Sequence, residues 1–73
     1  MMEASDILDR EFLETRARIL TVAATLDRMA RAEGSVEEDS RYQDLLKSLA
    51  LLAQGNAGSL AEEVQKIFSL SDD

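Results

Sequence analysis

The densest groups of chemically useful side chains in this sequence are acidic. Glu37, Glu38 and Asp39 are consecutive, and Glu62 and Glu63 form a second pair. Neighbouring carboxylates can work as general acids and bases or hold a divalent cation such as Mg²⁺. Both groups also fall where helices are expected to begin, and acidic residues favour helix N-termini for capping and dipole reasons alone. We therefore interpret both as structural and keep a metal site at Glu37, Glu38 and Asp39 as the competing hypothesis.

The composition removes most other chemistry. The chain contains no Cys and no His, which excludes thiol nucleophiles, imidazole catalysis and the usual zinc ligand sets. No serine stands in a Gly-x-Ser-x-Gly elbow, and no glycine-rich loop leads into Lys-Ser or Lys-Thr for phosphate binding. The sequence thus predicts a protein that is not an enzyme, with no catalytic residues and no cofactor.

Three arginines could serve as a contact surface. Arg10, Arg28 and Arg31 share one sector of the helical wheel of the first segment, where guanidinium groups could receive an acidic partner. The competing interpretation is that the arginines pair with acids one turn earlier on the same helix. Two acid-to-base spacings of four residues allow this for Arg10 and Arg31, namely Asp6 to Arg10 and Asp27 to Arg31, and a third such spacing joins Glu14 to Arg18.

The net charge of the chain limits the kinds of partner that it can bind. The net charge is −7, and residues 34–73 carry eight acids against three bases. A nucleic-acid binder needs a basic field, so neither DNA nor RNA is an expected partner. No apolar run reaches the length of a membrane span, and the N-terminus lacks the basic start of a signal peptide. We expect no membrane association and a cytoplasmic location.

Helices must position these side chains. The chain has 73 residues, enough for a single small domain over 1–73, and its composition favours helix throughout. Three glycines break it into segments. We predict an all-α helical bundle with a long helix at about 4–33, capped by Ser5 or Asp6 and ended by a left-handed Gly34. Shorter helices follow at about 40–54, with 36 as an alternative start, and at about 60–69; the turns are 34–39 and 55–59, and 70–73 is a frayed end.

The first helix carries two apolar stripes. One recurs at alternating steps of four and three residues and comprises Leu8, Phe12, Thr15, Ile19, Val22, Leu26 and Met29. The second lies roughly 150° around the helix and comprises Leu13, Ala17, Leu20 and Ala24. A helix with two apolar faces must be covered twice, so we predict a homodimer with the second stripe as its interface. The alternative is a three-helix monomer that buries both stripes.

The shorter helices each have an apolar face. The face expected for the second helix comprises Tyr42, Leu45, Leu46, Leu49, Leu52 and Ala53, which leaves Leu51 on the other side. The face expected for the third helix comprises Leu60, Val64, Ile67 and Phe68.

Several short motifs resemble a known pattern. They are Phe12-Leu13-Glu14-x-Arg16-Ala17, Ala23-Ala24-x-Leu26-Asp27-Arg28, Arg31-Ala32-x-Gly34 and Glu63-Val64-Gln65-x-x-Phe68-Ser69. Together they resemble small uncharacterised bacterial all-helical proteins, and the resemblance implies an all-helical fold without any activity or ligand.

Two classes of function remain. The favoured one is a non-enzymatic helical interaction module or accessory subunit, homodimeric, that presents an apolar groove or acidic face to a protein partner. The alternative is an accessory or regulatory protein that binds a divalent metal or small ligand through its acidic residues.

Overall fold

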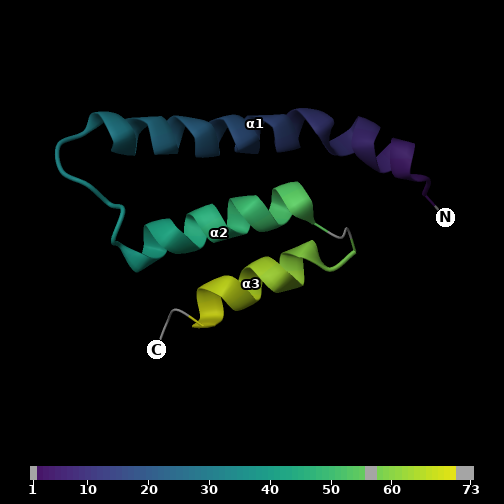
Figure 1. Ribbon diagram of the computed structural model, residues 1–73. Coiled ribbons are helices and arrows are strands. Elements are labelled where there is room, and N and C mark those ends of the chain that lie inside the picture. The colour runs from purple at the N-terminus through teal and green to yellow at the C-terminus, as the bar shows by residue number, and fades with distance from the viewer. Residues whose placement is uncertain (1, 56–57, 71–73) are drawn as a thin grey trace. The chain divides into compact units, whose positions relative to one another are not determined.

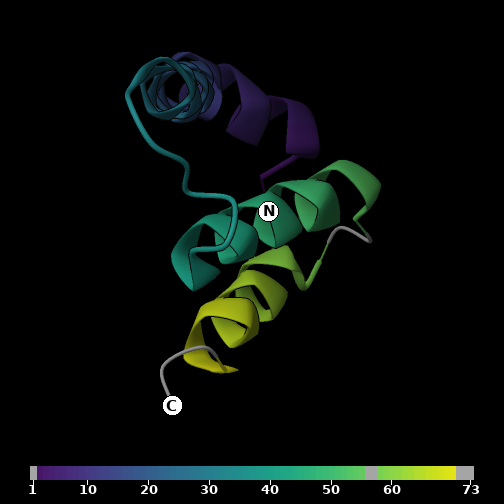
Figure 2. The ribbon, with the colours of Figure 1, turned by 60° about the vertical axis from the view of Figure 1, so that its left-hand side comes forward.

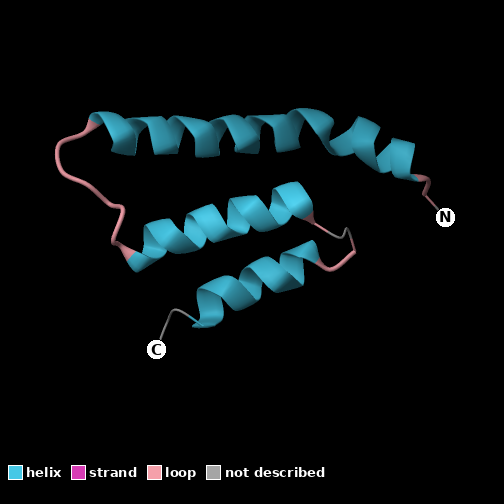
Figure 3. Ribbon diagram, viewed as in Figure 1, coloured by secondary structure: helices cyan, strands magenta, loops and turns pink. Residues whose placement is uncertain are grey.

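The computed structural model describes residues 2–55 and 58–70, and the part it describes contains three helices and no strand. They are α1 (Ala4–Arg31), α2 (Ser40–Gln54) and α3 (Leu60–Leu70), drawn in Figure 1 and separated from the loops by colour in Figure 3. The predicted all-α class and the order of one long and two shorter helices are confirmed. The chain divides into two compact units, Met1–Gly34 and Ser35–Asp73.

The α1 helix begins at Ala4, as predicted, but its N-cap lies two residues before the nearer of the two expected caps. Glu3 occupies the N-cap position, and its backbone N–H donates a hydrogen bond of 3.2 Å to Asp6 Oδ2. The Glu3 carbonyl accepts from the amides of Asp6 and Ile7. The prediction of Ser5 or Asp6 as the N-cap is therefore wrong. Asp6 still helps to start the helix, because its carboxylate reaches back from the third helical position, as the acid of a capping box does.

The α1 helix ends at Arg31, two residues before the predicted end. Ala32 is extended, with φ −76° and ψ 163°, and its N–H donates to the Arg28 carbonyl over 3.1 Å. Gly34 has a φ of +88°, so its predicted left-handed conformation is confirmed. It occurs in the bend that follows the helix, because Ala32 has already left the helical conformation.

The α2 helix begins where the sequence favoured, at Ser40. Asp39 is its N-cap, and the carboxylate accepts a hydrogen bond of 2.8 Å from the Arg41 backbone N–H. Before it, the Ser35 hydroxyl accepts from the Glu37 amide over 3.2 Å, and residues 37 and 38 form a short turn. The alternative start at residue 36 is thereby excluded.

Helices α2 and α3 lie side by side in both views of the ribbon (Figures 1 and 2) and contact each other. One stripe of α2 runs along Asp44, Ser48, Leu51 and Gly55. Asp44 and Ser48 are the buried residues of α2, and the Ser48 hydroxyl donates to the Asp44 carbonyl over 2.8 Å. Gly55 extends this stripe beyond the end of α2 and lies directly against Leu60. The contact is so close that a Cβ at residue 55 would overlap the Leu60 side chain.

The predicted apolar face of α2 is correct in part. Tyr42 and Leu49 are half-buried, as expected, but Leu45, Leu46 and Leu52 remain 39%, 42% and 50% exposed. Leu51, expected on the opposite side, is half-buried. Apolar periodicity indicated the face with the largest side chains. Close approach of two helix backbones is instead favoured by small residues, such as Ser48 and Gly55 in the buried stripe.

The inward face of α3 is largely as predicted. Leu60, Val64 and Ile67 are half-buried, while Phe68 is exposed at 37%. The Ser59 carbonyl accepts the first helical bond from the Glu63 amide. The helix extends through Leu70, which had been assigned to a frayed end. The predicted turn residues Asn56 and Ala57 and the predicted frayed residues 71–73 lie outside the described residues.

Candidate functional site

In the acidic group before α2, the Asp39 carboxylate stabilises the start of the helix. The Asp39 carboxylate accepts from Arg41 Nε over 3.0 Å and from Arg41 Nη2 over 2.8 Å, in addition to the Arg41 amide. The guanidinium hydrogen bonds, followed by the backbone bond, lower the pKa of Asp39 to about 2. Glu37 and Glu38 are exposed, and in the described ranges no three acidic side chains gather in a way that could hold a metal ion.

The three arginines proposed as a contact surface do not form one cluster. Arg10 Nη2 lies 3.3 Å from Met2 Sδ, and Arg28 Nη2 donates to Thr25 Oγ1 over 3.0 Å. Arg28 and Arg31 share the last turn of α1, but the 18 residues that separate Arg10 from Arg28 correspond to roughly 27 Å of helix.

One of the three expected ion pairs along α1 is formed. Arg18 Nη2 contacts Glu14 Oε1, with both side chains well exposed, so the pair contributes little to stability. The spacings from Asp6 to Arg10 and from Asp27 to Arg31 give no ion pair between those residues. Asp6 instead accepts from the Glu3 amide, as described above.

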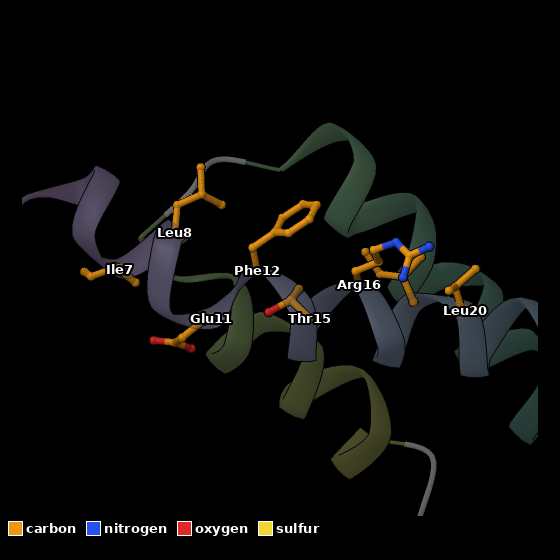
Figure 4. Close-up of a pocket in the computed structure, with 8 residues that line it drawn as sticks. Ile7, Leu8, Glu11, Phe12, Thr15, Arg16 and Leu20 are labelled. Carbon is orange, nitrogen blue, oxygen red and sulfur yellow. The ribbon is translucent and has the colours of Figure 1, made fainter.

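The longer of the two apolar stripes of α1 is its heptad face, which we define as Leu8, Phe12, Thr15, Ile19, Val22, Leu26 and Met29. Leu8 is 61% exposed, Phe12 52% and Ile19 64%. A shallow hollow of about 410 Å³ runs along this face (Figure 4), and it is lined by Ile7, Leu8, Glu11, Phe12, Thr15, Arg16, Ile19 and Leu20. Exposed apolar side chains in a continuous row mark an interaction surface more often than scattered ones do.

Charges of opposite sign flank this hollow. Glu11 lies on one side of the heptad face and Arg16 on the other, and neither takes part in an ion pair within the described chain. The Thr15 hydroxyl, at the centre of the face, also lacks a hydrogen-bond partner there. The two threonines on the next turns differ, because Thr21 and Thr25 donate to helix carbonyls over 3.0 and 2.9 Å.

The second stripe, Leu13, Ala17, Leu20 and Ala24, is also exposed. Leu13 is 74% and Leu20 53% accessible, and the two alanines are exposed as well. Its use as a dimer interface stays a prediction. Glu11 and Arg16 were not among the residues predicted to have a function. Their heptad positions could have indicated one, because each directly borders the apolar core positions, where charges determine how two helices pair.

No helix in the described residues is both long enough and apolar enough to cross a membrane. Comparison of the chain with protein-family models, curated proteins and solved structures finds no match.

Proposed function

We propose that this chain is a non-enzymatic helical interaction module or accessory subunit that acts as a homodimer, with α1 as the helix that joins the copies. The observation that carries the proposal is the exposure of α1. None of its residues is buried, although the helix has two apolar stripes.

The energetics of a helix support this proposal. A single amphipathic helix in water is marginal, because most helical stability in proteins comes from packing of the apolar face. Each Leu, Ile, Val or Phe side chain contributes about 1.5–3 kcal/mol when it is fully buried. The heptad face has Leu8, Phe12, Ile19 and Val22 all at least 41% exposed, so a covering surface would add substantial stability.

Two substitutions test whether α1 joins the copies. Ile19→Glu places a carboxylate on the heptad face, and Leu20→Glu places one in the second stripe; burial of either carboxylate would remove its hydration. We expect sedimentation equilibrium at tens of micromolar to give the dimer mass of about 16 kDa for the wild type. The variant whose substitution lies in the interface, either Ile19→Glu or Leu20→Glu, should give about 8 kDa. Thr21→Glu is the matched control, since Thr21 belongs to neither stripe. Dimer mass in both test variants would place the interface outside α1.

Calorimetry tests the competing function. The homodimeric module predicts no micromolar binding of Mg²⁺, Ca²⁺ or Mn²⁺. Micromolar binding that Glu38→Gln abolishes would favour the metal-binding accessory protein instead.

A further inference from the structure

We infer that the occupant of the heptad face of α1 is the same face of a second copy, in parallel orientation and in register, with Glu11 of each copy paired to Arg16 of the other. This inference rests on the proposed function and specifies the interface and the orientation. It also replaces the second stripe with the heptad face as the surface that joins like chains.

The apolar repeat of α1 has the period of a coiled coil. The 28 residues of α1 make four heptads, and the apolar positions recur through all of them. An apolar repeat sustained over three to four heptads, with charges beside it, is typical of a coiled coil. Leu8, Thr15, Val22 and Met29 then occupy the d positions and Phe12, Ile19 and Leu26 the a positions.

Charge complementarity identifies the partner and its direction. Glu11 is a g position, and Arg16 is the e position five residues later. In a parallel pair in register, the g residue of one helix faces the following e residue of the other, so two Glu11–Arg16 pairs form across the interface. Both side chains lack an ion-pair partner within the described chain, and both line the hollow on the heptad face.

Antiparallel arrangements fit less well. If α1 overlapped its antiparallel copy completely, Arg16 would meet Arg16 of the second copy and Arg18 would meet Arg18, which is unfavourable. A stagger of one heptad in one direction pairs these arginines with Asp9 and Glu11, but it reduces the overlap to residues 4–23 and leaves Leu26 and Met29 uncovered. The opposite stagger overlaps residues 10–31, leaves Leu8 uncovered and gives neither arginine an acidic partner.

Thr15 is compatible with the parallel pair. Its hydroxyl has no hydrogen-bond partner in the described residues and lies at the centre of an apolar face. In the parallel pair Thr15 faces Thr15 of the second copy, which provides a donor and an acceptor. In an antiparallel pair it faces an apolar side chain, and its hydroxyl can then donate only to its own helix, as Thr21 and Thr25 do.

A charge-exchange experiment tests the pairing. Glu11→Arg and Arg16→Glu each place like charges across both contacts, so each variant alone should dimerise about tenfold more weakly than the wild type. An equimolar mixture of the two variants should form a heterodimer of wild-type affinity, because each contact again joins opposite charges. The staggered antiparallel pair predicts no such recovery, since half of its contacts remain repulsive in the mixture. Glu14→Arg, at an outward position, is the control. Failure of the mixture to recover overturns the inference.

Thiol cross-linking tests the orientation and the face, because the natural chain has no cysteine. Leu8→Cys should form an intermolecular disulfide under mild oxidation, since parallel helices in register bring the two thiols together. Ala17→Cys should not cross-link, because residue 17 points away from the heptad face. If Ala17→Cys cross-links and Leu8→Cys does not, the inference is wrong, but a homodimer through the second stripe remains and the proposed function holds. Cross-linking of both variants, or of neither, also contradicts the inference. A monomeric wild type contradicts both the inference and the proposed function.

Discussion

At the scale of single residues, Asp39 is the clearest case of a side chain whose apparent chemistry is structural. The sequence placed it in an acidic group that could have held a metal ion. In the structure its carboxylate accepts from the Arg41 amide and from two guanidinium nitrogens, all within 3.0 Å. Its carboxylate therefore caps α2 and binds a cation that the chain itself provides.

This arrangement predicts a specific pH dependence. Because the pKa of Asp39 is lowered from 3.8 to about 2, its stabilising effect is complete above pH 4 and is lost as the pH falls through about 2. NMR titration of the Asp39 carboxyl should give a midpoint near 2. In Arg41→Gln, which retains the backbone amide, the midpoint should move back towards 3.8. A wild-type midpoint near 3.8 would show that the guanidinium contact does not form in solution.

At the scale of elements, helix boundaries were predictable where a local signal specified them. Asp39 before Ser40 fixed the start of α2, and Gly55 followed its end, so the bounds 40–54 are confirmed. The end of α1 was missed by two residues, because Gly34 marks a bend that the chain enters only after Ala32 has become extended. A glycine such as Gly34 therefore shows that a helix ends nearby, but it does not fix the last helical residue.

The packing of α2 was less predictable than its bounds. Three of its leucines, Leu45, Leu46 and Leu52, are exposed, whereas Asp44 and Ser48 are buried at 5% and 6% exposure. Hydrophobic periodicity describes one helix alone, and it contains no information on which face a neighbour can approach closely. Small side chains in the stripe that ends at Gly55 allow that approach, and a sequence pattern weighted by apolar size overlooks them.

Gly55 provides a direct test of this close packing. Its φ of −61° is accessible to any residue, so a substitution brings no backbone strain. A Cβ would nevertheless overlap Leu60 Cδ2 and lie 2.8 Å from the Leu51 carbonyl oxygen. Gly55→Ala should therefore destabilise the α2–α3 unit by about 1–3 kcal/mol. Thermal unfolding followed by circular dichroism should show a lower Tm than for Gln54→Ala, an exposed neighbouring control. An unchanged Tm would contradict the close contact with Leu60.

At the scale of the whole molecule, the exposed apolar surface of α1 is the central feature. The sequence anticipated two apolar stripes on one long helix and inferred that a second copy is needed, but it assigned the contact to the shorter stripe. Exposure alone does not separate the two stripes, because Leu13 and Leu20 are as exposed as Leu8 and Ile19. The charges of Glu11 and Arg16, which have no ion-pair partner in the described residues and border the heptad face, favour that face instead. The choice between the two stripes depends on neither a ligand nor catalytic chemistry.

Sedimentation equilibrium of the wild-type protein at tens of micromolar tests directly whether two chains associate. We expect a mass of about 16 kDa, twice the 8.1 kDa of one chain, with dissociation at lower concentration as mass action requires. A mass of about 8 kDa throughout this range would exclude the homodimer, because the apolar faces of α1 would then have to be covered within a single chain.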